Sequence, residues 1–257
     1  MTDGEPRVSV CMATYDGARW VEEQLASILA EIGPDDEVVV VDDASHDDTV
    51  ALVRAVDDPR VRLVAQERNR GYVRTFETAL GLARGRYVLL ADQDDVWEPG
   101  RVDALVDALG TVDVVASNLS TLGGPDAIRG PYGQRDWRLR SADSGHHVRN
   151  VLGILAGNRP YYGCAMGVRR EALARVLPFP ERLTESHDLW IALYGNLAGS
   201  ITHLDRSTVR RRFHGDNASP DKPRGVAAVV RSRLLLARCA WELRGRVRAA
   251  SARRAPA

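Results

Sequence analysis

YVLLADQDDVWEP, residues 87–99, joins a stretch typical of a buried strand to a cluster of acids. The residues from Tyr87 to Ala91 are mostly apolar, and Asp92, Asp94 and Asp95 follow within four positions. Carboxylates this close repel one another, so the cluster costs free energy unless a cation compensates for it. Hard divalent cations such as Mg²⁺ and Mn²⁺ take oxygen ligands and commonly bind carboxylates together with substrate phosphates. We therefore expect a metal site where this strand ends.

The sequence on both sides of this stretch alternates apolar runs with segments of helical spacing. Strands are expected at residues 7–13, 37–45, 61–66, 87–91 and 112–118, and helices at residues 19–32, 48–56, 72–83 and 102–109. Strands that alternate with helices indicate a parallel α/β sheet, and continuous apolar strands indicate that helices cover both of its faces. Residues 120–147 are expected to be irregular, and further helices are expected at 171–177 and 187–196.

Polar residues follow each of the first four strands, where an open α/β sheet binds its ligands. They are Thr14, Tyr15 and Asp16 after the first strand, Asp42 and Asp43 after the second, Glu67, Arg68 and Asn69 after the third, and the acids at 92–95 after the fourth. Asp at a strand end also starts turns, and we prefer that simpler interpretation for Asp47 and Asp58. No G-x-G-x-x-G follows the first strand and no G-x-x-x-x-G-K-[ST] occurs, which excludes a dinucleotide fold and a P-loop.

The charges are divided unevenly along a chain whose formal net charge is zero. Residues 1–128 contain 25 acidic and 11 basic side chains, whereas residues 129–257 contain 10 and 24. Three widely spaced cysteines fit a reducing compartment. Neither a signal peptide nor an apolar stretch long enough to span a bilayer is recognisable. We therefore expect a cytoplasmic protein, with peripheral contact at the inner face of the membrane as an open alternative.

The end of the chain has a different composition. We expect a boundary between a domain of residues 1–218 and an Arg-rich extension of residues 219–257. In this extension Val226, Val230, Leu234 and Trp241 recur at roughly helical spacing, with arginines between them. A basic amphipathic helix can pack against its own domain, form a homodimer contact or lie on an anionic membrane surface. Packing against protein is the preferred interpretation, and nucleic acid is disfavoured because the acidic half would repel it.

Four stretches together resemble a known family. VSVCMATYDGARWVEEQLASILA (8–30), EVVVVDDASHDDT (37–49), NRGYVRTFETALGLARGRYVLLADQDDVW (69–97) and GCAMGVRREAL (163–173) are similar to inverting family-2 glycosyltransferases of the GT-A fold. The DQDDVW form and HGDNAS (214–219) are most similar to the bacterial rhamnosyltransferase-like branch. The resemblance covers roughly residues 6–219. It implies one Rossmann-like mixed sheet flanked by helices, with a nucleotide-binding half (about 6–118) and an acceptor-binding half (about 119–218).

The resemblance also implies roles for the polar residues at the strand ends. Thr14, Tyr15 and Asp16 would line the nucleotide pocket, Asp43 would bind the base with Asp42 beside it, and Arg74 would lie near the nucleotide or diphosphate. Asp94 would bind Mg²⁺ or Mn²⁺ directly, Asp92 would contact the ribose or metal-bound water, and Asp95 would contact the donor sugar. His214 would contact the metal or the diphosphate. Trp97 fits a wall of the site and core packing equally well.

In this family the catalytic base lies at the N-terminus of a helix in the second half, usually in a Glu-Asp pair. Here the sequence is ESHDLWIAL, so Asp188 is the candidate base and His187 stands where the Glu would be. As alternatives, Asp188 only caps its helix, or His187 shares the base role. Tyr161, Tyr162, Gly163 and His187 would form the acceptor site, although two tyrosines leading into a strand fit a core equally well.

These features predict a metal-dependent inverting glycosyltransferase that moves a sugar from a UDP- or dTDP-sugar to a hydroxyl of a glycan or natural product. Rhamnose is the first expectation for the sugar, on resemblance alone, and the Q-x-x-R-W motif of processive members is absent. DQDDV also fits the D-x-D-x-[TV] motif of Mg²⁺-dependent aspartyl-nucleophile phosphatases, which place it after the first strand. A non-enzymatic receiver module needs a lysine at a late strand end, and Lys222 is the only lysine.

Overall fold

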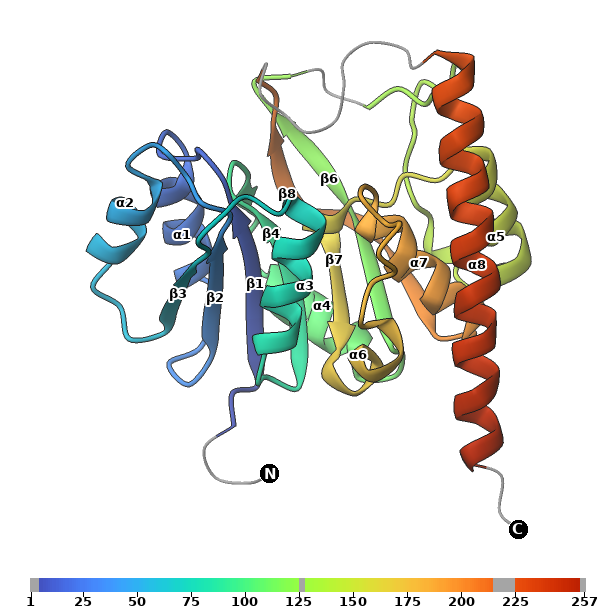
Figure 1. Ribbon diagram of the computed structural model, residues 1–257, viewed down its shortest axis with the longest axis horizontal. Coiled ribbons are helices and arrows are strands. Elements are labelled where there is room, and N and C mark those ends of the chain that lie inside the picture. The colour runs from blue at the N-terminus through green and yellow to red at the C-terminus, as the bar shows by residue number, and fades with distance from the viewer. Residues whose placement is uncertain (1–4, 125–127, 215–224, 255–257) are drawn as a thin grey trace.

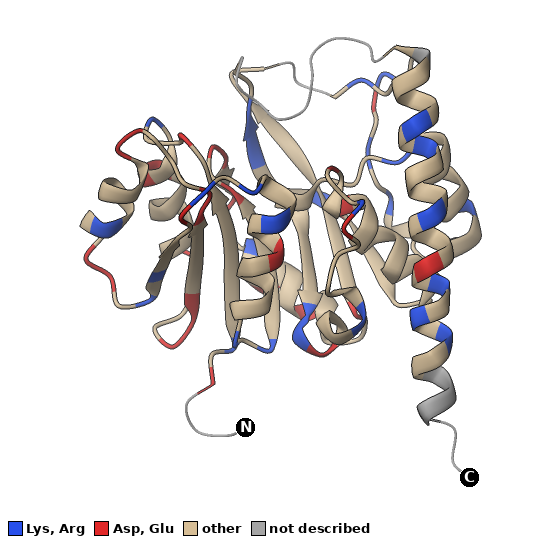
Figure 2. Cartoon of the chain, viewed as in Figure 1, with Lys and Arg blue, Asp and Glu red and all other residues tan. Residues whose placement is uncertain are grey.

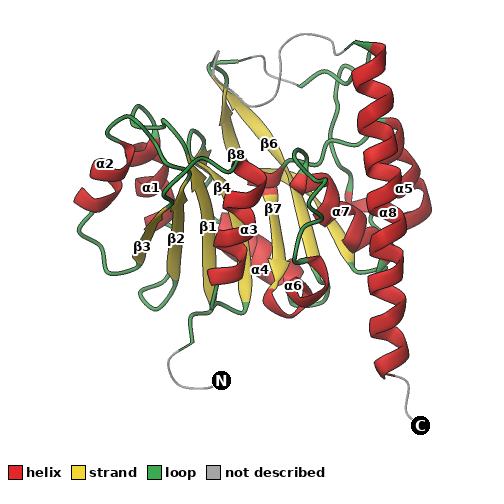
Figure 3. Cartoon of the chain, viewed as in Figure 1, coloured by secondary structure: helices red, strands yellow, loops and turns green. Residues whose placement is uncertain are grey.

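β1 (Val8–Thr14) lies near the middle of one eight-stranded sheet with the strand order β3-β2-β1-β4-β7-β6-β8-β5. The computed structural model describes residues 5–124, 128–214 and 225–254. Figure 1 shows helices packed on both faces of this sheet, and Figure 3 separates strands from helices and loops. The expected mixed α/β sheet flanked by helices is therefore confirmed.

The elements begin and end close to the positions that the sequence pattern predicts in the first half of the chain. The other strands are β2 (Glu37–Asp42), β3 (Val61–Ala65), β4 (Tyr87–Asp92), β5 (Val96–Trp97), β6 (Val114–Leu122), β7 (Met166–Arg169) and β8 (Ile201–Arg212). The helices are α1 (Val21–Leu29), α2 (Thr49–Ala55), α3 (Tyr72–Leu82), α4 (Arg101–Leu109), α5 (His147–Ala156), α6 (Arg170–Val176), α7 (His187–Leu197) and α8 (Val226–Arg254), with short 3₁₀ turns η1 (Ser141–Asp143) and η2 (Gly163–Ala165).

The first four strands of the chain, β1 to β4, run in the same direction. β1 pairs in parallel with β2 and β4, and β2 pairs in parallel with β3. Their carboxyl ends therefore meet at one edge of the sheet. The strand order reverses at β1, because β2 and β4 lie on its opposite sides, and open α/β sheets bind ligands at such a point. Antiparallel β7 then follows between β4 and β6.

The second half of the chain departs more from the sequence pattern. β6 continues through Leu122, past the end of the strand expected at residues 112–118 and into the segment expected to be irregular. Neither α5 nor β8 was expected from the sequence. β8 lacks a continuous apolar run because its exposure varies along its length: Thr208 and Val209 are buried, whereas Asp205 and Arg206 are exposed. Its pairing with β6 is also irregular between Ala116 and Leu119.

The side chains of the central strands alternate between two cores, one on each face of the sheet. In β1, Cys11 belongs to the core under α3, α6, α7 and α8, whereas Val10 and Met12 belong to the core under α1, α2 and α4. Successive side chains of a strand point to opposite faces. A strand covered on both faces must therefore be apolar throughout, which explains why apolar runs predict β1, β2 and β4 well.

α8 packs against the side of the molecule formed by α5, α6 and α7 (Figure 1). Leu236, Cys239 and Leu243 are buried in the same core as α7. Arg246 donates to the carbonyl oxygens of Arg175 and Val176, at 3.2 and 3.3 Å. One face of α8 thus packs against protein. In the described part of the chain, no helix has the length and apolar composition that crossing a membrane requires.

Arg101, the first residue of α4, is fully buried and joins three other elements. Its guanidinium donates to Thr208 Oγ1 in β8 at 2.6 Å, to the Leu90 carbonyl oxygen in β4 at 3.1 Å and to the Cys164 carbonyl oxygen in η2 at 2.6 Å. It also lies 4.4 Å from the centre of the Trp97 ring. Burial lowers the pKa of Arg101 to about 10. This one side chain therefore fixes the positions of β4, β8 and η2 relative to one another.

Arg101→Leu should lower the free energy of unfolding by about 3 kcal/mol, because it leaves buried acceptors without their donor. The measurement is the urea-unfolding midpoint. Arg54→Leu is the matched control, since Arg54 is an exposed arginine on α2 and should change stability by less than about 0.5 kcal/mol. Equal midpoints for the two variants would show that the Arg101 hydrogen bonds do not support the fold.

Candidate active site

A cavity of about 1000 Å³ opens where the carboxyl ends of β1, β2 and β4 meet. Its other walls come from the start of α3, from η2, from the loop that leads into α7 and from the end of β8. Most of the residues singled out in the sequence line it: Thr14, Tyr15, Asp16, Asp43, Asp92, Asp94, Tyr162, Gly163, His187, Asp188 and His214. The fold thus gathers side chains that are up to two hundred residues apart in the sequence.

The loop after β1 is held against the acidic turn by Gln93. The Tyr15 amide donates to Gln93 Oε1 at 2.9 Å, and Gln93 Nε2 donates back to the Tyr15 carbonyl oxygen at 2.9 Å. Asp16 has a φ of 45° and accepts a hydrogen bond from the His46 amide at 2.7 Å. Gln93 was not singled out in the sequence, because an amide between two acids has no distinctive pattern.

The two acids that end β2 have different positions. Asp42 is fully buried outside the cavity lining and accepts a hydrogen bond from Thr14 Oγ1 at 2.8 Å. Asp43 lines the cavity, and its two oxygens accept hydrogen bonds from the amides of Arg70 and Gly71, at 2.7 and 2.9 Å. Gly71 has a φ of +82°, which favours glycine, so Asp43 fixes a sharp turn immediately before α3.

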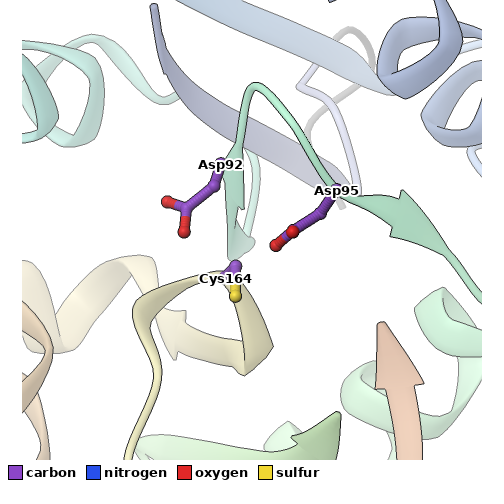
Figure 4. Close-up of side chains that lie close together, drawn as sticks. All are labelled: Asp92, Asp95 and Cys164. Atoms are coloured by element: carbon purple, nitrogen blue, oxygen red, sulfur yellow. The ribbon is translucent and has the colours of Figure 1, made fainter. Parts of the chain in front are cut away.

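The acids that follow β4 lie close together, as Figure 4 shows for Asp92 and Asp95 with the Cys164 thiol between them. Donor atoms of these three residues lie within 4.8 Å of one another. Asp95 is buried: its Oδ1 accepts a hydrogen bond from the Arg212 amide at 3.1 Å, while its Oδ2 has no donor among the described residues. Burial and the neighbouring carboxylates raise the pKa of both Asp92 and Asp95. The predicted repulsion is therefore present in the folded chain.

Asp94 and His214 offer the better pair of ligands for a divalent cation. Asp94 Oδ2 lies 2.7 Å from His214 Nε2, and the imidazole ring stacks on Trp20 with 5.5 Å between ring centres. This pair supplies a carboxylate oxygen and an imidazole nitrogen, ligand types that suit a cation such as Mn²⁺. Burial raises the pKa of the Cys164 thiol, and a neutral thiol is a poor ligand for Mg²⁺ or Mn²⁺. The residues present therefore fit a metal without Cys164.

Asp188 occupies the first turn of α7 and lines the cavity. Burial raises its pKa to about 6, although the amides of Leu189 and Gly163 and the charge of Arg211 act in the opposite direction. The Leu189 amide donates to Asp188 Oδ1 at 2.8 Å. A Cβ on Gly163 would lie 3.0 Å from His187 Nε2, so the glycine permits the close approach of η2 to α7. A carboxylate with a pKa near 6 is well suited to accept a proton at neutral pH.

His187 is buried beside Asp188 and lies among aromatic rings. Its ring stacks on Phe76 with 4.3 Å between centres and meets Tyr72 edge-on at 5.7 Å. Burial lowers its pKa to about 3, so the imidazole is neutral at physiological pH. Neither ring nitrogen has a hydrogen-bond partner within the described residues, although the ring lines the cavity. Both nitrogens are themselves buried within the protein.

Arg211, near the end of β8, is a cavity residue that the sequence did not single out from its two arginine neighbours. Its guanidinium lies 5.6 Å from the centre of the Tyr162 ring. Its positive charge opposes the rise in pKa that burial causes at Asp92, Asp95 and Asp188. Arg210 instead pairs with Glu98 at 3.5 Å, and Arg212 pairs with Glu23 at 2.6 Å. Of these three arginines, Arg211 is the one whose side chain lines the cavity. This follows from its position along β8 and could not be inferred from the sequence.

Besides Asp42 and Asp95, three further expected residues lie outside the cavity lining. Arg74 binds Glu77 and the carbonyl oxygens of Phe179, Pro180 and Leu183, so it fastens α3 to the segment before α7. Trp97 is buried in the core and contacts Arg101. Of the two roles expected for Trp97, core packing is therefore the one observed. The Tyr161 hydroxyl lies 2.9 Å from His203 Nε2, inside the protein. The remainder of HGDNAS, residues 215–219, falls beyond the described residues.

Known proteins resemble this chain in sequence and in fold. The family model described as "Glycosyl transferase family 2" matches residues 9–177. The chain is 41% identical over 123 residues to the succinoglycan biosynthesis protein ExoO of Rhizobium meliloti, a match that covers 47% of this chain and 35% of that protein. It is 28% identical over 190 residues to the UDP-Glc:alpha-D-GlcNAc-diphosphoundecaprenol beta-1,3-glucosyltransferase WfgD of Escherichia coli, which covers 72% of this chain and 69% of that protein.

A solved structure shares the fold. The crystal structure of S. aureus TarS 1–349 in complex with UDP-GlcNAc superimposes with a TM-score of 0.65 at 19% identity, over 90% of this chain and 66% of that one. The first curated relatives are longer than the part that this chain matches, since it spans 35%, 66% and 42% of their lengths.

One carboxyl signal in a ¹³C NMR titration of aspartate-labelled protein should report Asp188. Asp188 and Asp95 should both titrate near pH 6, since burial raises the pKa of each to about 6, and one of these two resonances should be missing from the spectrum of Asp188→Asn. Arg211→Ala should move the pKa of Asp188 upward, because it removes a positive charge that favours the carboxylate. Arg210→Ala is the matched control and should leave it unchanged. The same upward shift in both variants would contradict the position assigned to Arg211.

Proposed function

The chain belongs to glycosyl transferase family 2, and on that premise we propose that it transfers a sugar from a nucleoside-diphosphate donor to an acceptor hydroxyl, with inversion at the anomeric carbon. One observation carries the proposal. A half-buried carboxylate with a raised pKa, Asp188, shares a cavity with the acidic turn after β4 and with the basic end of β8. Such a cavity holds a base for the acceptor on one side and groups for an anionic leaving group on the other.

The donor nucleotide is proposed to bind at the ends of β1 and β2. Thr14, Tyr15, Asp16 and Asp43 line that part of the cavity, and Asp42 supports Thr14 from within the protein. Tyr15 is 41% exposed, so its ring is accessible to a nucleobase. Asp43 Oδ1 accepts hydrogen bonds from the Arg70 amide and from Gln66 Nε2, whereas Oδ2 accepts one from the Gly71 amide and so keeps a second lone pair for the base. This part of the chain is the proposed nucleotide-binding half, about residues 6–118.

The diphosphate is proposed to lie between the acidic turn and the end of β8. Asp94 and His214, with Asp92 beside them, would hold Mg²⁺ or Mn²⁺, which neutralises charge on the leaving diphosphate when it is bound. Arg211 supplies a fixed positive charge in the same cavity. Asp95 lies deeper than the cavity lining, so its proposed role is to position Arg212 and the neighbouring acids rather than to contact the donor sugar.

The transfer itself needs one base and one leaving group. As the acceptor oxygen forms its bond to the anomeric carbon, Asp188 takes the hydroxyl proton, and the bond between that carbon and the phosphate oxygen breaks to release the nucleoside diphosphate. A base of pKa about 6 is ionised at neutral pH yet binds a proton more readily than an ordinary carboxylate. His187, with a pKa near 3, is a much weaker base, so Asp188 alone is assigned the role.

The acceptor or the transferred sugar is proposed to contact Tyr162, Gly163 and His187, in the acceptor-binding half of about residues 119–218. A buried neutral imidazole offers one donor and one acceptor, which matches a hydroxyl group. A nitrogen left without a partner there disfavours substrates that lack the matching hydroxyl. The proposed role of His187 is therefore recognition rather than proton transfer.

The donor and acceptor are proposed by class. The E. coli relative has UDP-Glc and a GlcNAc-diphosphoundecaprenol acceptor in its name, and S. aureus TarS was crystallised with UDP-GlcNAc. A UDP- or dTDP-hexose and a glycan or natural-product acceptor are proposed for this chain. dTDP-rhamnose is kept as a donor to test, because DQDDVW resembles that branch. The phosphatase alternative is not favoured, since the acidic motif follows β4 rather than β1.

Asp188→Asn should reduce transfer by about 10²–10⁴-fold while leaving the affinity for the nucleoside diphosphate unchanged, because it removes only the base. In the unsubstituted protein, the rate should be constant above about pH 6 and fall toward tenfold per pH unit below it, since protonated Asp188 accepts no proton. Release of nucleoside diphosphate from a panel of nucleotide sugars, with acceptor present, measures the rate of transfer and its dependence on pH.

His187→Gln serves as the matched control for this experiment. It should keep the pH dependence and lower kcat by only a few-fold, while raising KM for the sugar substrate that it contacts. A pH profile that changes in His187→Gln but not in Asp188→Asn would reverse the assignment of the base. Rapid hydrolysis of a phosphomonoester without release of nucleotide would contradict the transferase proposal itself.

Asp94→Asn and His214→Ala should each weaken Mn²⁺-dependent binding of UDP or dTDP by about tenfold or more, because each removes a proposed ligand. The measurement is the thermal shift produced by the nucleotide with and without Mn²⁺. Asp103→Asn is the control, since the side chain of Asp103 is 81% exposed and pairs with Arg7 on the surface. Unchanged Mn²⁺-dependent shifts in both ligand variants would place the metal elsewhere.

A further inference from the structure

α8 has two chemically different faces. Its inner face buries Leu236, Cys239 and Leu243 against the core, as described above. Its only acid, Glu242, belongs with this side, since it pairs with Arg246 at 2.8 Å and with Arg182 of the loop before α7. The inner face therefore satisfies both its apolar and its acidic side chains within the protein.

The outer face of α8 is apolar and basic. Val230, Leu234 and Trp241 are 51%, 58% and 81% exposed. Four arginines are exposed around them: Arg231, Arg238, Arg244 and Arg248. Figure 2 shows blue segments recurring along α8 with a single red one. An exposed tryptophan flanked by arginines on a helix without an outward acid needs a partner that is both apolar and anionic.

The neighbouring helix has the same character. α5 contacts α8, and Arg233 of α8 approaches the carbonyl oxygen of Ile154 in α5 at 3.5 Å. On α5, Val148 and Leu152 are 76% and 61% exposed, and Arg149 between them is exposed as well. Two adjacent helices thus present large apolar side chains together with arginines.

We propose that the outer face of α8, with α5 beside it, binds an anionic membrane surface. Arginines bind lipid phosphates while their stems and the neighbouring Leu and Trp side chains enter the boundary of the acyl chains. A second copy of the chain is a poorer partner, because a two-fold contact would place these arginines against the same arginines. A bilayer surface supplies both negative charge and apolar depth along the length of the helix.

This surface is separate from the proposed active site. No residue of α5 or α8 lines the cavity, within the part of the chain that the structure describes. A bound membrane would therefore leave the cavity able to bind a soluble nucleotide. Loss of membrane binding and loss of nucleotide binding can accordingly be separated by experiment, and the membrane proposal does not depend on the transferase proposal.

The test is co-sedimentation of the full chain with vesicles of phosphatidylcholine alone or of an equimolar mixture with phosphatidylglycerol. We expect binding to the mixed vesicles only, and weaker binding as salt is raised. Arg238→Glu with Arg244→Glu should reduce the partition coefficient about twentyfold or more, from about fivefold for each basic residue near an anionic surface. Trp241→Ala should reduce it severalfold without changing the charge.

The matched control carries Arg54→Glu and Arg86→Glu. These substitutions make the same change in net charge at exposed arginines that lie outside α5 and α8. It should bind the mixed vesicles like the unsubstituted chain. Equal loss of binding in the two double variants, or equal binding to both kinds of vesicle, would overturn the proposal. So would a dimer in sedimentation velocity that dissociates when Arg238 and Arg244 are replaced. The thermal shift with nucleotide should be the same in every variant.

Discussion

The crowding of carboxylates after β4 is the constraint to which the rest of the site responds. Asp92, Asp94 and Asp95 are close enough for burial and mutual repulsion to raise the pKa of two of them. The compensating groups come from the end of β8, where the Arg212 amide binds Asp95, His214 binds Asp94 and the charge of Arg211 acts on Asp92 and Asp95. β8 must therefore reach this turn accurately, and the buried guanidinium of Arg101 links it to β4 and η2.

In the folded chain, the acidic and the basic halves of the sequence contribute charges to different surfaces. The acidic half supplies the ends of β1, β2 and β4, where a nucleotide and a cation are proposed to bind. The basic half supplies Arg211 to the same cavity and a row of exposed arginines to α8, on a different side of the molecule. A net charge of zero thus results from two surfaces of opposite character, each with its own proposed partner.

The sequence predicted best what depends on local pattern. Strands buried on both faces are apolar runs, so β1, β2 and β4 and the acids that end them were placed almost to the residue, and Asp188 was placed at the start of its helix. Prediction failed where contacts are distant. β8 is only partly buried and has no continuous apolar run, so no strand is expected there and Arg211 could not be told from Arg210 or Arg212. Arg74 is expected near the nucleotide on the family resemblance alone, and the carbonyl oxygens that it binds, more than a hundred residues away, leave no local pattern. The low pKa of His187 likewise arises from burial among rings of other segments.

The most direct test is a crystal structure with Mn²⁺ and UDP, in which anomalous scattering locates the metal. A peak bound by Asp94 and His214, with the diphosphate on its open side and Arg211 nearby, is the expected result. It would show that a cation relieves the repulsion among the acids and holds the leaving group. A peak bound instead by Asp92, Asp95 and Cys164, or a nucleotide bound with no metal among these acids, would contradict the account.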